Sequence, residues 1–198
     1  MGLRGVVVLA TVLAATPALA QGAATVDVAC KPQRPWDQVK KRVSPYDSTE
    51  FRVFGQRALV CYGRPSLRGR HMVGGEAVPY GKLWRTGANE PTIVHLPVAA
   101  TIAGIKVQPG SYSLYTVPTE KEWTVIVNRS TSQWGEEHGY TADIQKQEVG
   151  RAQVPAEALQ APVEQFTIRA LPRGGQGADL VLEWERSRVV VPVQATGK

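Results

Sequence analysis

The chain has 198 residues, of which 43% are hydrophobic, 20% charged and 7% aromatic. This composition excludes a disordered polymer, a collagen and a membrane protein with several spans, and it is typical of one globular domain behind a short leader. Lysine and arginine outnumber aspartate and glutamate by 23 to 17, which gives a net charge of +6 and favours anionic partners.

Residues 1–20 have the pattern of a secretory signal peptide. Arg4 supplies a positive charge, residues 6–15 form an apolar run too short to span a bilayer, and residues 18–20 read Ala-Leu-Ala. We therefore expect cleavage after Ala20, a mature chain without a transmembrane segment, and a periplasmic or secreted location. The alternative is a single uncleaved membrane anchor, which the shortness of the apolar run disfavours.

The only two cysteines of the chain are Cys30 and Cys61. In an oxidising compartment the default prediction is one disulfide between them. Closing a loop of about 31 residues would restrict the unfolded chain and stabilise the fold by about 3 to 4 kcal/mol. The alternative is a pair of free thiols, one of them buried as a small hydrophobic group.

Residues 21–48 are predicted to form an extended N-terminal arm, because prolines recur along them, with one helical turn at residues 36–41. Positive charge is concentrated in residues 31–60, where seven basic residues stand against three acidic ones: Lys31, Arg34, Lys40, Lys41, Arg42, Arg52 and Arg57. Outside the cytoplasm such a bias favours lipid headgroups, lipopolysaccharide or acidic glycans over nucleic acid. The alternative is a solvated basic surface with no partner.

Residues 49–198 are predicted to form one antiparallel β domain, because short alternating runs are punctuated by glycine and proline. The expected strands are residues 51–54, 57–62, 92–96, 101–102, 105–107, 111–117, 123–128, 166–170, 179–185 and 188–193. About nine or ten strands without a long helical period predict a β-sandwich or a flattened barrel. Residues 109–110 predict a type II turn, and residues 156–160 predict a single helical turn.

The densest polar chemistry lies in two motifs that also make the sequence recognisable. Residues 62–70 read Tyr-Gly-Arg-Pro-Ser-Leu-Arg-Gly-Arg, and residues 78–90 read Val-Pro-Tyr-Gly-Lys-Leu-Trp-Arg-Thr-Gly-Ala-Asn-Glu. Together with residues 109–114, 122–126, 133–135 and 182–185, they make the chain from about residue 51 to 193 resemble the bacterial domain-of-unknown-function family 2911. The resemblance implies an exported, β-rich single domain and assigns no activity to it.

The same motifs predict a ligand site. Arginine and lysine side chains there only donate hydrogen bonds, while an asparagine and a glutamate accept them, and tryptophan beside such groups on a β scaffold is how carbohydrate-binding modules hold sugars. The candidate ligand-binding residues are Arg64, Arg70, Lys82, Trp84, Arg85, Asn89, Glu90 and Trp134. In the structural alternative, Trp84 plugs one end of the sandwich and Arg85 pairs with Glu90 to hold the loop.

Two functions follow from these candidates. The first is a non-catalytic binding or structural module, without a cofactor, that contacts an anionic or carbohydrate component of the cell envelope. The second is a small extracytoplasmic hydrolase that uses Glu90 or Glu76 with His71 or His138. Metal binding is not expected, because His71, His95 and His138 are at least 24 residues apart and no zinc motif occurs.

Overall fold

The structure is a computed structural model that describes residues 1–2 and 28–197. The predicted signal peptide and its cleavage site at Ala20 lie outside the described residues, apart from the first two. The helices are short: α1 (Trp36–Val39), η1 (Glu137–Gly139) and α2 (Ala142–Gln145). The strands are β1 (Tyr46–Val53), β2 (Gln56–Gly63), β3 (Thr92–Leu96), β4 (Ala100–Ile102), β5 (Ile105–Val107), β6 (Gly110–Pro118), β7 (Glu122–Asn128), β8 (Glu148–Pro172) and β9 (Gly177–Ala195).

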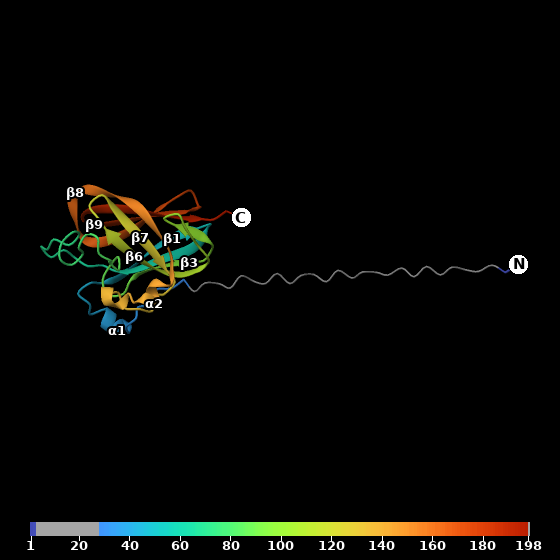
Figure 1. Cartoon of the computed structure of the whole chain (residues 1–198), viewed down its shortest axis with the longest axis horizontal. Helices are drawn as coiled ribbons and strands as arrows, with labels where there is room; N and C mark the ends of the chain where they lie inside the picture. The colour runs from blue at the N-terminus through green and yellow to red at the C-terminus, as the bar shows by residue number, and fades with distance from the viewer. Residues whose placement is uncertain (3–27, 198) are drawn as a thin grey trace.

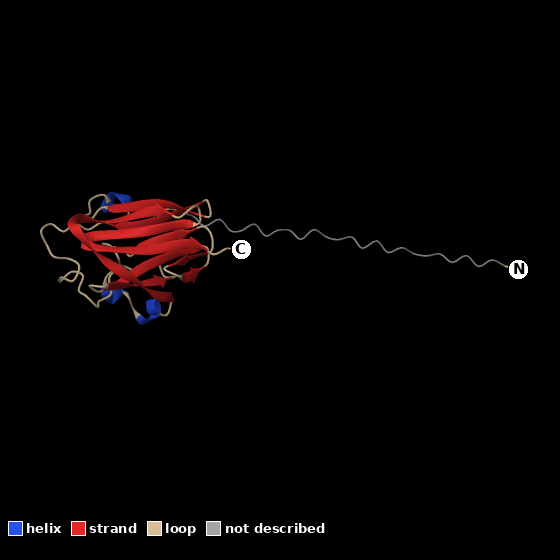
Figure 2. Ribbon diagram, turned by 90° about the horizontal axis from the view of Figure 1, so that it is seen from above, coloured by secondary structure: helices blue, strands red, loops and turns tan. Residues whose placement is uncertain are grey.

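The strands form one antiparallel nine-stranded sheet in the order β1-β2-β3-β6-β7-β8-β9-β4-β5. The two longest strands, β8 and β9, change register twice along their pairing, and such irregularities bend a sheet. The sheet folds over so that β1 also lies against β8 and β9 (Figures 1 and 2). The predicted all-β antiparallel sandwich is confirmed, and among the described residues no helix is long and apolar enough to cross a membrane.

Local turn chemistry explains two of the hairpins. Phe54 and Gly55 have φ of 53° and 74° between β1 and β2, and Ala103 and Gly104 have φ of 49° and 82° between β4 and β5. Two-residue loops with positive φ at both positions match the right-handed twist of the strands. The expected strands on either side of these loops are therefore joined as tight hairpins. The predicted type II turn at residues 109–110 is wrong, because Gly110 is extended with φ of 158° and begins β6.

Two other expectations need correction in the second half of the chain. The predicted helical turn at residues 156–160 is wrong, because these residues belong to β8, where Ala156 pairs with Val189 and Glu157 with Arg188. Pairing along a neighbouring strand outweighs the helical preference of alanine, glutamate and leucine. The two strands expected at residues 179–185 and 188–193 are one strand, β9, interrupted at Glu185, whose φ is 53°.

The hydrophobic core lies between the folded-over layers of the sheet. Trp123, Val125 and Val127 alternate along β7 and are at most 1% exposed, as the period of two predicts. Trp184 of β9 is also 1% exposed and belongs to the same core cluster. The rings of Tyr62 and Phe166 make an edge contact across the layers, with their centroids 5.7 Å apart.

The N-terminal arm is attached to this domain by the predicted disulfide. Cys30 and Cys61 are bonded, with their Cα atoms 5.6 Å apart, so the alternative of free thiols is excluded. Cys61 is a central residue of β2, and the arm therefore crosses the outside of the sheet at β2 before α1, which forms at the predicted helical turn. A closed loop of this length stabilises the fold by about 3 to 4 kcal/mol.

Candidate functional site

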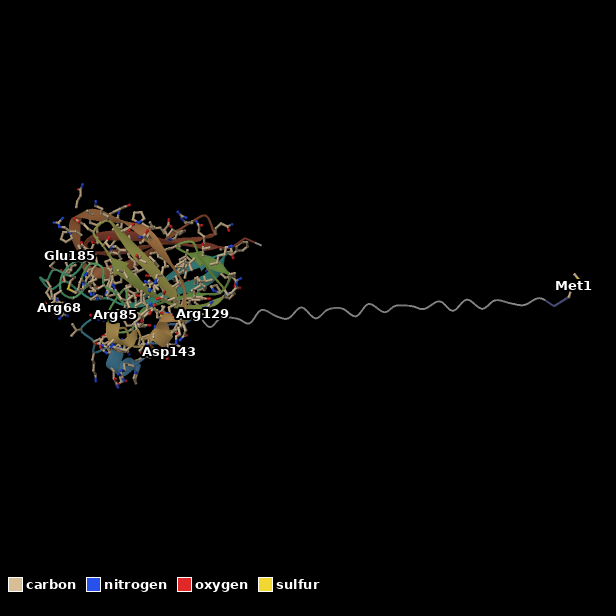
Figure 3. All side chains as sticks on the ribbon, in the orientation of Figure 1. Met1, Arg68, Arg85, Arg129, Asp143 and Glu185 are labelled. Carbon is tan, nitrogen blue, oxygen red and sulfur yellow. A yellow bond between two sulfur atoms is a disulfide. The ribbon has the colours of Figure 1, made fainter. Side chains whose placement is uncertain are left out.

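The segment that joins β2 to β3 carries seven of the eight candidate ligand-binding residues. It lies at the end of the domain away from the C-terminus (Figure 1). Arg68, Thr86 and Asn89 have positive φ along it, so the chain turns tightly there. Figure 3 shows Arg68, Arg85 and Glu185 at this same end.

Trp84 is part of the core. It is 6% exposed, it stacks on Trp184 with centroids 5.6 Å apart and an interplanar angle of 18°, and it makes edge contacts with Trp123 and Phe166. Its indole Nε1 donates to the carbonyl oxygen of Gly87 at 3.1 Å. The ring therefore closes one end of the sandwich, and both of its faces are covered by protein.

Glu90 is 3% exposed and holds the N-terminal arm. Its carboxylate accepts hydrogen bonds from Arg42 Nη1 at 2.6 Å and Nη2 at 2.8 Å, and from the backbone nitrogen of Gln33 at 2.9 Å. The expected partner in the structural alternative was Arg85, but the actual partner lies 48 residues away in the sequence. With all of these bonds made inside the protein, the carboxylate is not available to a ligand or a catalytic step.

Trp134 lies in the loop after β7 and contacts the same arm. The guanidinium carbons of Arg34 and Arg42 are 5.5 and 5.8 Å from its ring centroid. A guanidinium over an indole face is attracted by the electron density of the ring. The indole therefore packs against two cations of the arm, and with Glu90 it fixes the arm to the end of the domain.

Arg64 and Arg70 also make internal contacts. Arg64 forms an ion pair with Asp47 at 2.9 Å and donates to the Phe166 carbonyl and the Thr167 hydroxyl, so it links the two layers. Arg70 donates to the carbonyl oxygens of Ser66 and Leu67 within its own loop. These two guanidinium groups hold the loop and leave few donors for a ligand.

The remaining cations, Lys82 and Arg85, lie together at a surface pocket of about 320 Å³, which we call the Arg85 pocket. Its lining consists of Glu76, Ala77, Pro79, Lys82, Leu83, Trp84, Arg85 and Gly135. Lys82 is exposed at the rim, whereas Arg85 is partly buried. The loop after β7 forms one wall, because the Gly135 backbone nitrogen donates to the Asn89 carbonyl oxygen at 3.1 Å.

Within the described part of the chain, the Arg85 guanidinium forms no hydrogen bond and no ion pair, and its buried Nε has no partner. Burial lowers the pKa of Arg85, while the charge of Glu136 acts in the opposite direction. The nearby Tyr115 does not neutralise it, because burial raises the pKa of that phenol to about 12. An arginine stays protonated in proteins, so Arg85 is a partly desolvated cation without a counter-ion.

Asn89 follows Arg85 in the same segment but does not line the pocket. Its φ of 68° is a left-handed conformation that asparagine tolerates better than most residues. Its side-chain Nδ2 is buried without a hydrogen-bond partner. Of the eight predicted residues, the structure therefore brings Lys82 and Arg85 together at one pocket, leaves a buried donor of Asn89 unused, and places the other five in structural contacts.

The residues of the hydrolase alternative lie beside this pocket. His71 and Glu76 line a neighbouring hollow of about 530 Å³, together with Arg70, Met72 and Ala77. His138 is exposed and lies 3.1 Å from Glu136. The described residues contain no cluster of three or more histidine, cysteine, aspartate or glutamate side chains that could hold a metal.

Sequence reasoning missed Glu185, which orients His71. Its carboxylate lies 2.7 Å from His71 Nδ1 and accepts from the backbone nitrogens of Met72 and Val73. Burial raises the pKa of Glu185, but its hydrogen bonds from His71 and these two amides outweigh burial and leave the pKa lowered. No local motif could have revealed this contact, because Glu185 and His71 are 114 residues apart.

A profile of one family, described as a protein of unknown function and designated DUF2911, matches residues 44–193. The chain belongs to the DUF2911 family. The match confirms the resemblance noted in the sequence, and it includes every lining residue of the Arg85 pocket. The part of the arm that carries Cys30, Gln33 and Arg42 precedes the matched DUF2911 region. No curated protein and no solved structure matched the chain in the same comparisons.

Proposed function

We propose that this DUF2911 domain is a binding module that holds an anionic group, such as the carboxylate or phosphate of an acidic glycan or another envelope component, in the Arg85 pocket. The supporting observation is the partly buried Arg85 guanidinium that lacks a hydrogen bond or ion pair to any described residue. A planar guanidinium can bind a carboxylate or phosphate through two parallel hydrogen bonds. Such a ligand would supply the counter-ion that the protein itself does not provide.

The other pocket residues fit an anion that is attached to a polar molecule. Lys82 adds a second positive charge at the rim, and its flexible side chain can follow a ligand that enters from solvent. Glu76 lines the same pocket and accepts hydrogen bonds, as sugar hydroxyls require. This combination favours an acidic sugar over a simple inorganic anion.

The proposed location is the periplasm or the exterior of the cell. The Cys30–Cys61 disulfide is consistent with an exported protein, because disulfides persist in oxidising compartments. The sequence of residues 1–20 supports the same location as a signal peptide. An acidic polymer of the envelope would then be within reach of the Arg85 pocket.

Binding is tested by thermal unfolding of the protein with galacturonate oligosaccharides, inorganic phosphate and neutral maltotetraose. A ligand that binds only the folded state raises the melting temperature, by an amount that grows with its concentration. We expect galacturonate oligosaccharides to raise it, maltotetraose to leave it unchanged, and Arg85→Gln to abolish the increase. Without ligand, Arg85→Gln should be as stable as the wild type or more stable, because an uncompensated cation is removed.

The matched control is Arg129→Gln, which removes the same charge from an exposed position on another part of the surface (Figure 3). This variant should keep the full ligand effect. The proposal fails if no anionic probe stabilises the wild type, or if Arg85→Gln and Arg129→Gln lose the effect to the same extent. The second result would indicate nonspecific attraction to a basic surface.

A hydrolase that uses Glu76 with His71 is the second candidate function. Its support is that both residues line one hollow and that Glu185 binds Nδ1 of His71, which leaves Nε2 directed away from that carboxylate. This is how a carboxylate orients a histidine for proton transfer. Release of nitrophenol from 4-nitrophenyl glycosides, lost in Glu76→Gln and in His71→Asn, would support this function. No release by the wild type, or unchanged release by both variants, would contradict it.

A further inference from the structure

Two neighbouring strands place a serine against a buried histidine. Ser111 of β6 and His95 of β3 are direct partners in the antiparallel register, and Ser111 Oγ lies 2.7 Å from His95 Nδ1. His95 is 8% exposed, whereas Ser111 is partly exposed. Both backbones are fixed by strand pairing, so the distance between the hydroxyl and the imidazole is set by the sheet and not by a flexible loop.

This pair opens into a surface pocket of about 310 Å³, which we call the Ser111 pocket. Its lining consists of Ala29, Lys31, Tyr46, Ile93, His95, Ser111 and Thr131. Two of these residues flank Cys30, and the disulfide partner Cys61 is opposite Ile93 in the register of β2 and β3. The disulfide therefore fixes the wall that the arm contributes. The Ser111 pocket and the Arg85 pocket share no lining residue.

We propose that Ser111 is a nucleophile activated by His95 and that the Ser111 pocket takes a small carboxylic ester. The inference goes beyond the proposed anion binding and does not depend on it. A serine hydroxyl is a weak nucleophile until an adjacent base accepts its proton, and 2.7 Å is within the range of such a transfer. The imidazole needs its own proton on Nε2, which leaves the Nδ1 lone pair directed at the hydroxyl.

The proposed step balances within the pocket. Ser111 Oγ attacks the carbonyl carbon of the ester as its proton passes to His95 Nδ1. The bond from the acyl carbon to the leaving alkoxide then breaks, and the alkoxide takes the proton from His95. Water releases the acyl group from Ser111 in a second, equivalent step. Lys31 lines the same pocket and adds positive charge to its surroundings.

A biotinylated alkyl fluorophosphonate tests the nucleophile without knowledge of the natural ester. The serine oxygen bonds to phosphorus, the phosphorus–fluorine bond breaks, fluoride leaves and the proton passes to the histidine. We expect peptide mass spectrometry of the labelled full chain to place the probe on Ser111. Ser111→Ala should abolish labelling, and His95→Gln should slow it by about 10² to 10⁴, the usual contribution of a positioned base.

Two controls separate activation from simple exposure. Ser132→Ala removes an exposed serine that lies beside the pocket residue Thr131 but does not line the pocket, so this variant should be labelled like the wild type. Heat-denatured wild-type protein should not be labelled. Thr131→Trp should fill part of the pocket and suppress labelling, although the serine and the histidine both remain. If His95→Gln does not fold, this variant tests whether labelling of Ser111 depends on the pocket. The proposal is overturned if Ser111 of the native protein carries no probe, or if a folded His95→Gln is labelled within about threefold of the wild-type rate.

Discussion

Arg42→Met should lower the free energy of unfolding by about 3 to 5 kcal/mol, because it leaves the Glu90 carboxylate buried without its counter-ion. The side chains of Arg42 and Glu90 are 11% and 4% exposed, and two hydrogen bonds join them. Glu90 would keep only the backbone nitrogen of Gln33 as a donor. Urea unfolding followed by tryptophan fluorescence measures this loss.

The matched control is the exposed ion pair of Asp143 and Lys146, whose side chains are 85% and 75% exposed. Asp143→Ala should change stability by less than about 0.5 kcal/mol, as solvent-exposed pairs contribute little. The double variant Arg42→Met with Glu90→Leu should recover most of the loss, because it leaves no buried charge unpaired. A loss below about 1 kcal/mol for Arg42→Met alone would show that the pair does not hold the arm.

Trp84→Ala should lower the free energy of unfolding by about 3 to 5 kcal/mol, since it leaves a cavity among closely packed rings. The lost contacts are the stack on Trp184, the edge contacts with Trp123 and Phe166, and the hydrogen bond to Gly87. Urea unfolding followed by circular dichroism measures the effect.

Trp36→Ala is the control for this prediction. Trp36 is 51% exposed, and its ring makes one edge contact, with Tyr46. We expect it to cost about 1 kcal/mol or less. Equal losses for the two variants would mean that the position of Trp84 in the core is wrong. Because Trp84→Ala weakens the whole domain, the Arg85 variants are the better probes of ligand binding.

The sequence patterns that predicted the fold are local ones. Alternation along residues 123–128 places Trp123 on the buried face of a strand, and the expected strands at residues 101–102 and 105–107 are the two that the hairpin at residues 103–104 joins. The bend of β8 had no such signal, since the interrupted pairing of β8 with β9 is a property of two strands and not of one. For the same reason, the local preferences of residues 156–160 predict a helical turn, although these residues pair with β9.

The candidate site was less predictable because its partners are distant in the sequence. The composition of residues 64–90 indicated many hydrogen-bond donors, but it could not assign Glu90 to Arg42, 48 residues earlier. The sequence offered a buried Trp84 that closes one end of the sandwich only as the structural alternative, and the structure confirms that alternative for Trp84. The sequence does not show which arginine finds a partner in the folded protein. The structure shows that Arg64 pairs with Asp47, whereas Nε of Arg85 has no partner.

The attachment of the arm also determines which fragment of the chain contains a complete DUF2911 domain. The family match begins at residue 44, after Cys30, Gln33 and Arg42. In an expression fragment that started there, Cys61 would be a free thiol and the buried Glu90 would lack its ion-pair partner Arg42. The Ser111 pocket would also lack the wall that Ala29 and Lys31 contribute. Domain boundaries chosen from family similarity alone would therefore produce a weakened protein, and boundaries that begin before residue 28 keep the folding unit intact.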